Sequence, residues 1–280
     1  MAAPRTELGK RVATAIVGVA AILAVLIFGG LGGTMFFTFV ISLGMILEFG
    51  SITFSLADAK EKRTVLALIS AVSLLGCFVT VGSEFAWMIG GFLLLSVFFL
   101  LRAGRYEDER EFSRHYRELC YSVFGMIYLV FVPLYLPKVF QFGGPDRGHH
   151  WVLLFLSIVW AGDTGAYFAG LNFGRHKLFP RVSPKKTVEG AIGGLLAGLA
   201  AALLYKVALL SELSVLGAIV ISLMVGVVAP LGDLCESFLK RAFDKKDSGS
   251  LLPGHGGFLD RFDGVVFSLP VMYACMRLFS

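Results

Sequence analysis

The stretch from Lys246 to Gly264 reads KDSGSLLPGHGGFLDRFDG and brings carboxylates, glycines and a histidine into a chain that is mostly apolar. Asp260 and Asp263 are three residues apart, so they share one face of the helix expected to follow. Two close carboxylates repel each other unless a cation lies between them, and hard oxygen ligands suit Mg²⁺. Carboxylates are also favourable at a helix N-terminus, so a capping role is the alternative. His255 stands among glycines and could bind a metal, donate to a phosphate or cap the helix.

The segment PLGDLCESFLKR, just before that stretch, carries a second group of polar residues. Asp233, Glu236, Ser237 and Lys240 are spaced so that they form one polar stripe on a helix leaving the membrane. A solvated helix end would explain the stripe, but Asp233 lies about ten ångströms deeper than Lys240 at the helical rise. Gly232 beside Asp233 would let another backbone or a ligand come close.

The segment RVSPKKTVEG combines cations and hydroxyls at the start of an apolar run. Lys185 and Lys186 lie beside Ser183 and Thr187, and Glu189 opens the next span. Ammonium groups, hydroxyls and a helix N-terminus together are typical of a phosphate-binding site. The segment lacks the GxxxxGK[ST] pattern of a Walker A loop. Lysine pairs that only mark the cytoplasmic end of a span are the alternative.

Acidic residues inside apolar runs point to function, because burying a charge in a membrane is costly. Asp163 and Tyr167 share a helix face, and they form either a structural hydrogen-bonded pair or the polar wall of a water-filled cavity. Glu48 also lies within a span, and any role for it rests on that position alone. The small residues at positions 190, 194 and 198 predict a helix-packing face.

These residues must be positioned by membrane helices. The chain has 280 residues, of which 56% are hydrophobic and only 16% charged, with a mean hydropathy of +0.78. A soluble domain would carry about a quarter charged residues. The sequence predicts an all-α, polytopic integral membrane protein whose first connection is a glycine turn at 29–33. Its nine spans are predicted at 12–30, 33–56, 64–82, 84–101, 119–140, 151–171, 190–210, 214–236 and 262–279.

The distribution of Lys and Arg predicts the orientation. The N-terminus and the loops 57–63, 102–118, 172–189 and 237–261 together hold 21 of the 25 Lys and Arg residues. These segments alternate onto one side, which the positive-inside rule makes cytoplasmic. We therefore expect a cytoplasmic N-terminus and a C-terminus on the far side. We divide the chain into N-terminal membrane helices, 1–118, and a catalytic membrane region, 119–280, with cytoplasmic loops 172–189 and 237–261.

The segment SFLKRAFDKKDSGSLLPGHGGFLDRFD, residues 237–263, resembles the signature of the phosphatidate cytidylyltransferases. That pattern asks for a serine, a Lys-Arg pair, a Lys-Asp pair, a His-Gly-Gly triplet, and two aspartates that flank an arginine and a hydrophobe. Every position is present: Ser237, Lys240-Arg241, Lys246-Asp247, His255-Gly256-Gly257 and Asp260-Arg261-Phe262-Asp263. SPKKTVEG and DTGAYFAGLNFG are similar to two further blocks of the family. The resemblance covers roughly 155–275.

The resemblance implies a reaction in which CTP and phosphatidic acid give CDP-diacylglycerol and pyrophosphate. It also implies Mg²⁺, with a second cation left open, an active site facing the cytoplasm, and a homodimer in the cell membrane that binds membrane lipid and no nucleic acid. Carried onto this sequence, it assigns the metal to Asp233, Asp260 and Asp263, and catalytic roles to Lys240, Arg241 and His255. The substrates would contact Ser183, Lys185, Lys186, Thr187, Glu189, Lys246, Asp247 and Asp163.

Two other functions fit parts of the pattern. A cation- or proton-coupled transporter would also use buried acids such as Asp163, Asp233 and Glu48. However, the acids gather toward the cytoplasmic side, and no inverted repeat with paired broken helices is visible. A CTP-dependent lipid kinase would transfer the γ-phosphate instead, and only the signature separates it from a cytidylyltransferase.

Overall fold

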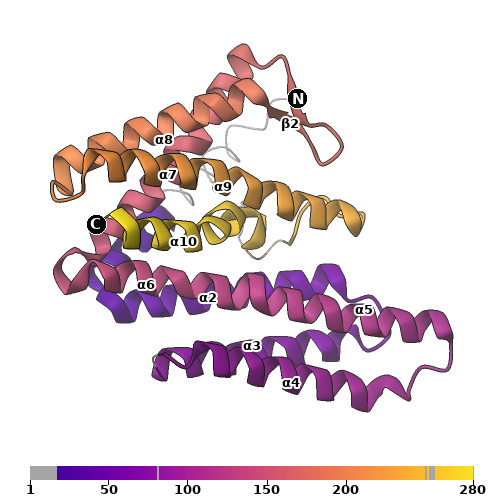
Figure 1. Cartoon of the computed structure of the whole chain (residues 1–280). Helices are drawn as coiled ribbons and strands as arrows, with labels where there is room; N and C mark the ends of the chain where they lie inside the picture. Colours follow the sequence, from indigo (N-terminus) through magenta and orange to yellow (C-terminus); the bar gives the residue numbers. More distant parts are fainter. Residues whose placement is uncertain (1–17, 81, 250, 252–255, 280) are drawn as a thin grey trace. The chain divides into compact units, whose positions relative to one another are not determined.

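The computed structural model describes residues 18–80, 82–249, 251 and 256–279, and these are mostly helical. Eight helical stretches in the described part of the chain are long and apolar enough to cross a membrane, so the chain is an α-helical, multi-pass membrane protein (Figure 1). The elements are α2 (Gly30–Thr53), α3 (Ala59–Val79), α4 (Glu84–Ala103), α5 (Glu109–Met126), the π-helix η1 (Ile127–Phe131), the 3₁₀ turn η2 (Val132–Leu134), α6 (Tyr135–Phe142), α7 (Gly144–Phe173), β1 (Lys177–Phe179), β2 (Ser183–Thr187), α8 (Val188–Leu209), α9 (Val215–Ala242) and α10 (Leu259–Phe279).

Eight of the nine predicted spans each overlap one of these stretches. The fifth is a continuous helical run, Glu109–Phe142, in which α5 passes through η1 and η2 into α6. Of the first predicted span, the described part is the short apolar helix Gly18–Phe28, and residues 12–17 lie outside the described residues. The predicted glycine turn is present, because the helix breaks at Gly29 and α2 begins at Gly30 with φ +55°. The count of nine and the orientation remain predictions.

The chain forms two compact units. The first unit contains 1–21, 35–134 and 247–260, and the second contains 22–34, 135–246 and 261–280. The predicted division after residue 118 was drawn from where the motifs lie, whereas these units reflect compactness, so that division remains a prediction. The two units are described separately below.

In the first unit, apolar side chains from α2, α3 and the α5–η2 run form the core. Leu74, Cys77, Val130 and Leu134 are buried together, with Phe39 packed against them. Small residues allow these helices to approach closely, as is usual between membrane helices. A Cβ atom at Gly125, for example, would lie 2.8 Å from the ring of Phe49. Many apolar side chains of α4 are exposed, as expected for a helix that faces lipid.

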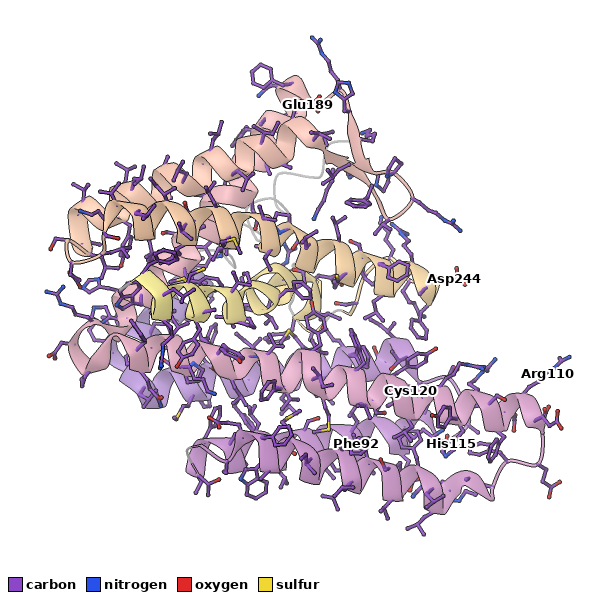
Figure 2. All side chains as sticks on the ribbon, in the orientation of Figure 1. Phe92, Arg110, His115, Cys120, Glu189 and Asp244 are labelled. Carbon is purple, nitrogen blue, oxygen red and sulfur yellow. The ribbon has the colours of Figure 1, made fainter. Side chains whose placement is uncertain are left out.

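A buried charged network ties the start of α3 to α5 in the same unit. Lys62 Nζ lies 2.6 Å from Glu118 Oε2 and 2.9 Å from Asp58 Oδ1, and both the Lys62 and Glu118 side chains are fully buried. Tyr106 accepts a hydrogen bond from Lys62 (3.0 Å) and donates one to Asp58 (2.6 Å). His115, labelled on α5 in Figure 2, contacts the carbonyl oxygen of Phe99 on α4 at 2.8 Å. These contacts fix the connections at one end of α3, α4 and α5.

In the second unit, α7 packs along α8, and α8 also packs against α9. The contact between α7 and α8 is made by small residues: a Cβ at Gly194 would lie 2.9 Å from the carbonyl oxygen of Gly162, and one at Gly190 would lie 2.9 Å from that of Ala166. Gly198 faces Ile158 in the same way. The packing face predicted for residues 190, 194 and 198 is therefore confirmed.

The loop expected at 172–189 contains a short antiparallel hairpin, β1–β2, in which Lys177 pairs with Thr187 and Phe179 with Ser183. This is the one sheet in the described part of the chain. Thr187 then caps α8, because its side-chain oxygen accepts a hydrogen bond from Gly190 N at 3.1 Å. Downstream, α9 and α10 each contain a proline, Pro230 and Pro270.

Candidate active site

A cavity of about 560 Å³ lies in the second unit, between α7, α8, α9 and the β-hairpin. Most of its wall is apolar or glycine, contributed by the small residues at which α7 and α8 approach each other. Its charged side chains come from all of these elements except α8: Asp163 from α7, Lys177, Lys185 and Lys186 from the hairpin, and Asp233 from α9. A concave apolar site with a few polar groups that converge on it is the usual form of a small-molecule site.

Lys186 is held in the cavity wall by α9. Its Nζ donates to Asp233 Oδ2 at 3.0 Å and to the carbonyl oxygen of Pro230 at 3.2 Å. Within β2, Lys186 is half-buried and its neighbour Lys185 is exposed, although both line the cavity. One cation is therefore anchored by a carboxylate while the other projects more freely.

Asp163 lies in the wall of the same cavity, on α7. Its side chain is within electrostatic range of both Asp233 and Lys186, and it is accessible because it borders the cavity rather than the packed core. Tyr167, one helical turn later, also lines the cavity, and no hydrogen bond between the two side chains is found among the described residues. The structure thus places Asp163 in a polar wall, which favours that reading over a structural Asp–Tyr pair.

Asp233 and Asp263 are brought together where α9 crosses α10. A Cβ at Gly232 would lie 2.6 Å from the carbonyl oxygen of Asp263, and one at Gly264 would lie 2.7 Å from Asp233 Oδ1. The prediction that Gly232 permits a close backbone approach is confirmed. Asp263 is buried and accepts a hydrogen bond from Gly264 N at 2.8 Å, and its carboxylate is near enough to that of Asp233 for the two to interact electrostatically.

This pair of carboxylates fits a divalent cation. Two carboxylates in contact repel each other unless a proton or a cation lies between them. Across the described residues, no three His, Cys, Asp or Glu side chains gather closely enough to hold a metal by themselves. Mg²⁺ does not need such a set, because it is usually held by one or two carboxylates together with substrate phosphates and water. Asp233 and Asp263 can supply the two carboxylates.

Asp260, the third predicted metal ligand, lies in the first turn of α10 and belongs to the first unit. Its Oδ2 accepts hydrogen bonds from Ser248 N (3.0 Å), Ser248 Oγ (2.8 Å) and Gly257 N (3.1 Å). The Ser248 hydroxyl also contacts Glu48 Oε2 at 3.0 Å. One oxygen of Asp260 therefore holds Ser248 and Gly257 of the signature segment together. Its spacing from Asp263 did not reveal this role.

Two of the predicted substrate-binding residues have structural partners outside the cavity. Glu189, at the start of α8 in Figure 2, accepts hydrogen bonds from Arg175 N (3.0 Å) and from His176 N and Nδ1 (3.2 and 2.6 Å). It therefore fastens the end of α7 to the start of α8. Ser183 begins β2 and does not line the cavity. Thr187 both caps α8 and lines the cavity.

The signature cations lie near the end of α9. Lys240 Nζ is 2.7 Å from the buried carboxylate of Glu236 one turn earlier, so that part of the predicted polar stripe is an ion pair. Arg241, Lys246 and Asp247 are exposed. His255 lies outside the described residues. The roles predicted for these residues remain predictions. Ser248, which the pattern did not single out, contacts both Glu48 and Asp260, and its burial beside the exposed Asp247 could not be read from the sequence.

Comparison with known proteins gives one family. Residues 9–279 match the model of the cytidylyltransferase family. The chain is similar to the phosphatidate cytidylyltransferase of Bacillus subtilis (strain 168), with 46% identity over 123 residues, which are 44% of this chain and 46% of that protein. It is also similar to the phosphatidate cytidylyltransferases of Staphylococcus saprophyticus (36% over 179 residues; 64% of this chain, 66% of that one) and Staphylococcus aureus (strain COL) (47% over 129 residues; 45% and 49%).

The matched parts span between about half and two thirds of the length of these relatives. The family match, in contrast, covers almost the whole chain, including both the hairpin segment and the signature segment. On that match, this chain belongs to the cytidylyltransferase family.

Proposed function

We propose that the protein transfers a cytidylyl group from CTP to phosphatidate, giving CDP-diacylglycerol and pyrophosphate. An oxygen of the phosphatidate phosphate forms a bond to the α-phosphorus of CTP. The bond from that phosphorus to the oxygen bridging the α- and β-phosphates breaks, and pyrophosphate leaves with the bonding electrons. The attacking oxygen is already anionic near neutral pH, so the site needs no strong general base. Its task is to bring two polyanions together and to neutralise charge.

The observation that carries this proposal is the cavity in which Lys185 and Lys186 from the hairpin face Asp163 and Asp233. The two lysines bind phosphate oxygens, and the Lys186–Asp233 contact fixes where one ammonium group stands before substrate arrives. The apolar part of the wall, from α7 and α8, suits the acyl and glycerol portions of a lipid. Serine, histidine or cysteine nucleophiles are not required by this chemistry.

Mg²⁺ is part of the proposal. Asp233 and Asp263 would hold it together with phosphate oxygens of the substrate, and Asp260 is the third candidate ligand. When bound, the ion neutralises charge that develops on the departing pyrophosphate. A second cation, the remaining signature cations Lys240, Arg241 and Lys246, and a homodimer are supported by the family resemblance.

The proposed orientation places this chemistry at the cytoplasmic surface of the cell membrane. CTP is water-soluble, whereas phosphatidate is anchored in the bilayer, so the site must border both phases. The cationic segments 172–189 and 237–261 lie on the side that the positive-inside rule makes cytoplasmic. The reactive phosphates can therefore meet at the level of the lipid headgroups.

The test is a direct assay of the purified protein in detergent with phosphatidic acid, Mg²⁺ and CTP labelled either in the cytidine or at the γ-phosphate. We expect the cytidine label to appear in lipid and the γ-label in pyrophosphate. Transfer of the γ-label to lipid would identify a CTP-dependent lipid kinase instead. Failure of either label to enter lipid, with a protein that remains folded, would contradict the proposal.

A further inference from the structure

Glu48 on α2 is 3% exposed, and its carboxylate contacts the signature segment at two places, Ser248 and Leu259. Its Oε2 accepts a hydrogen bond from Leu259 N at 3.0 Å and lies 3.0 Å from Ser248 Oγ. All of these residues belong to the first unit. A buried carboxylate in a membrane helix is costly, and an apolar residue would serve helix packing as well. The carboxylate therefore has a task other than packing.

Two glycines of the signature segment leave room for this carboxylate. A Cβ at Gly249 would lie 2.6 Å from Glu48 Oε1, and a Cβ at Gly257 would collide with Glu48 Oε2 and Ser248 Oγ. Each is too close for a real side chain. The backbone can approach Glu48 at Gly249 and at Gly257 because glycine has no Cβ.

Ser248 connects Glu48 to Asp260. Its oxygen is 3.0 Å from Glu48 Oε2 and 2.8 Å from Asp260 Oδ2. A serine hydroxyl has one hydrogen, so it can donate fully to only one of these carboxylates at a time. The position of each carboxylate therefore depends on the other through one shared hydroxyl.

From this arrangement, we propose that Glu48 is a positioning residue. Through Ser248 and the backbone N–H of Leu259, it fixes the Asp260 carboxylate and the first turn of α10 in the arrangement that the reaction uses. Its catalytic consequence rests on the proposed function, whereas its effect on the signature segment can be measured separately.

Two substitutions separate positioning from mere space-filling. Glu48→Ala removes both contacts, and we expect kcat to fall by roughly tenfold to a hundredfold, the range of lost hydrogen bonds to a charged group, with a smaller change in the KM for CTP. Glu48→Gln can keep an oxygen at the position of Oε2, where it still accepts from Leu259 N and from Ser248 Oγ, and it loses only the negative charge. We expect Gln to restore kcat to within about threefold of the wild type.

The matched control is Thr53→Val. Thr53 is buried on the same helix, and its hydroxyl donates to the carbonyl oxygen of Phe49 within α2. It therefore tests the loss of a buried polar group on this helix without a contact to the signature segment, and we expect it to leave kcat unchanged.

Hydrogen–deuterium exchange of peptides covering 256–262 gives a readout besides activity. In Glu48→Ala, the Leu259 amide should exchange roughly tenfold faster or more, and in Glu48→Gln at nearly the wild-type rate. Gly249→Ala provides a second test, because the nearest atoms its Cβ would meet all belong to Glu48. Its defect should be large in the wild type and should largely disappear when Glu48 is already alanine.

The results separate the two proposals. A wild-type protein that makes no CDP-diacylglycerol overturns the proposed function, and exchange at Leu259 still decides the positioning claim. Unchanged exchange in Glu48→Ala, equal losses of kcat in the Ala and Gln variants, or a Gly249→Ala defect that is the same in both backgrounds overturns the role of Glu48. Should Glu48→Ala fail to insert, Ser248→Ala removes the shared hydroxyl alone and must accelerate exchange at Gly257 for the proposal to stand.

Discussion

Lys186 on β2 and Asp233 on α9 form an ion pair with an Nζ–Oδ2 distance of 3.0 Å in the wall of the cavity. The pair joins the hairpin to the helix that carries the signature cations. Because both side chains are partly solvated, the value of the pair lies in where it holds the ammonium group rather than in stability.

Lys186→Ala removes a positioned cation from the proposed phosphate site. We expect kcat/KM to fall on the order of a hundredfold, as for the loss of one electrostatic contact to a reacting group, while the protein stays folded. Lys186→Arg should recover part of the activity, because the charge survives but its geometry changes. Lys206→Ala, which removes a lysine of α8 outside the cavity lining, is the control. Full activity in the Lys185→Ala, Lys186→Ala double variant would show that the two lysines only mark the cytoplasmic end of a span.

Asp260→Asn distinguishes a metal ligand from a helix cap. The amide keeps an oxygen for the N–H groups of Ser248 and Gly257 but loses the negative charge. If Asp260 binds Mg²⁺, activity should fall roughly a hundredfold or more with little change in thermal stability, and added Mg²⁺ should restore it only in part. Asp108→Asn, at the N-cap of α5, is the matched control and should be silent because Asn and Asp cap equally well. Near-normal activity of Asp260→Asn at limiting Mg²⁺ would leave Asp260 as a cap.

Glu118→Gln tests the buried charged network of the first unit. It removes the charged partner at 2.6 Å from the fully buried Lys62 ammonium and leaves the ion pair with Asp58 in place, so we expect the protein to lose about 1–3 kcal/mol of unfolding free energy. Glu61→Gln, which affects the solvent-exposed contacts to Arg102 and Arg105, should cost less than about 1 kcal/mol. The measurement is the unfolding midpoint in detergent. Equal effects of the two variants would show that burial does not set the strength of the Lys62–Glu118 pair.

The same network predicts a loss of stability in acid. Burial opposes ionisation of Asp58, but hydrogen bonds from Tyr106 and Lys62 outweigh it and lower the pKa of Asp58. A carboxyl group with a lowered pKa stabilises the fold above its unfolded pKa of about 4, and this contribution disappears as pH falls through the folded pKa. The thermal midpoint in detergent should therefore drop below pH of about 4.

Asp58→Asn should reduce this drop of the thermal midpoint in acid. Tyr106→Phe should shift the drop to higher pH, because Asp58 loses one hydrogen bond. Burial and the bond to Asp58 raise the pKa of Tyr106. The stability that the neutral phenol provides is therefore present below its unfolded pKa of about 10 and is lost only as pH rises through the higher folded value. If the thermal midpoint drops equally in acid in Asp58→Asn and in the wild type, Asp58 is not the group responsible.

The predicted orientation can be tested with reporters fused to the C-terminus. With nine spans and a cytoplasmic N-terminus, a reporter that is active only outside the cytoplasm should be active there, and a cytoplasmic reporter should be silent. A fusion in the 102–118 segment should give the reverse pattern. If both fusions report the same side, the span count and the placement of the signature segment beside cytoplasmic CTP are wrong.

Hydropathy predicted most of the helices, because their apolar runs have the length of a bilayer. Their ends were less predictable: α7 begins at Gly144 rather than near 151, since the polar turn that contains Asp146 and Arg147 is helical although it is not apolar. The hairpin was read as a loop, because Pro184 and the lysine pair resemble loop residues and the pairing of Lys177 with Thr187 is a contact between strands.

The chemistry-bearing residues were visible in the sequence, but their partners were not. Spacing along one helix placed Asp260 near Asp263, and family resemblance added Asp233. The contact between Glu48 and Ser248, however, joins positions 200 residues apart. No local pattern can report such a contact, and only the helix packing brings the two side chains together.

Pro230 has one more consequence for the wall of the cavity. Proline has no amide hydrogen, so the carbonyl group of Gly226, four residues earlier, has no donor within α9. Gly226 and Pro230 both line the cavity, and an orphan carbonyl facing hydrocarbon is expensive. We therefore expect water at this strip of α9, and the nucleotide of the proposed reaction would keep part of its hydration there on entering the cavity instead of losing all of it at once.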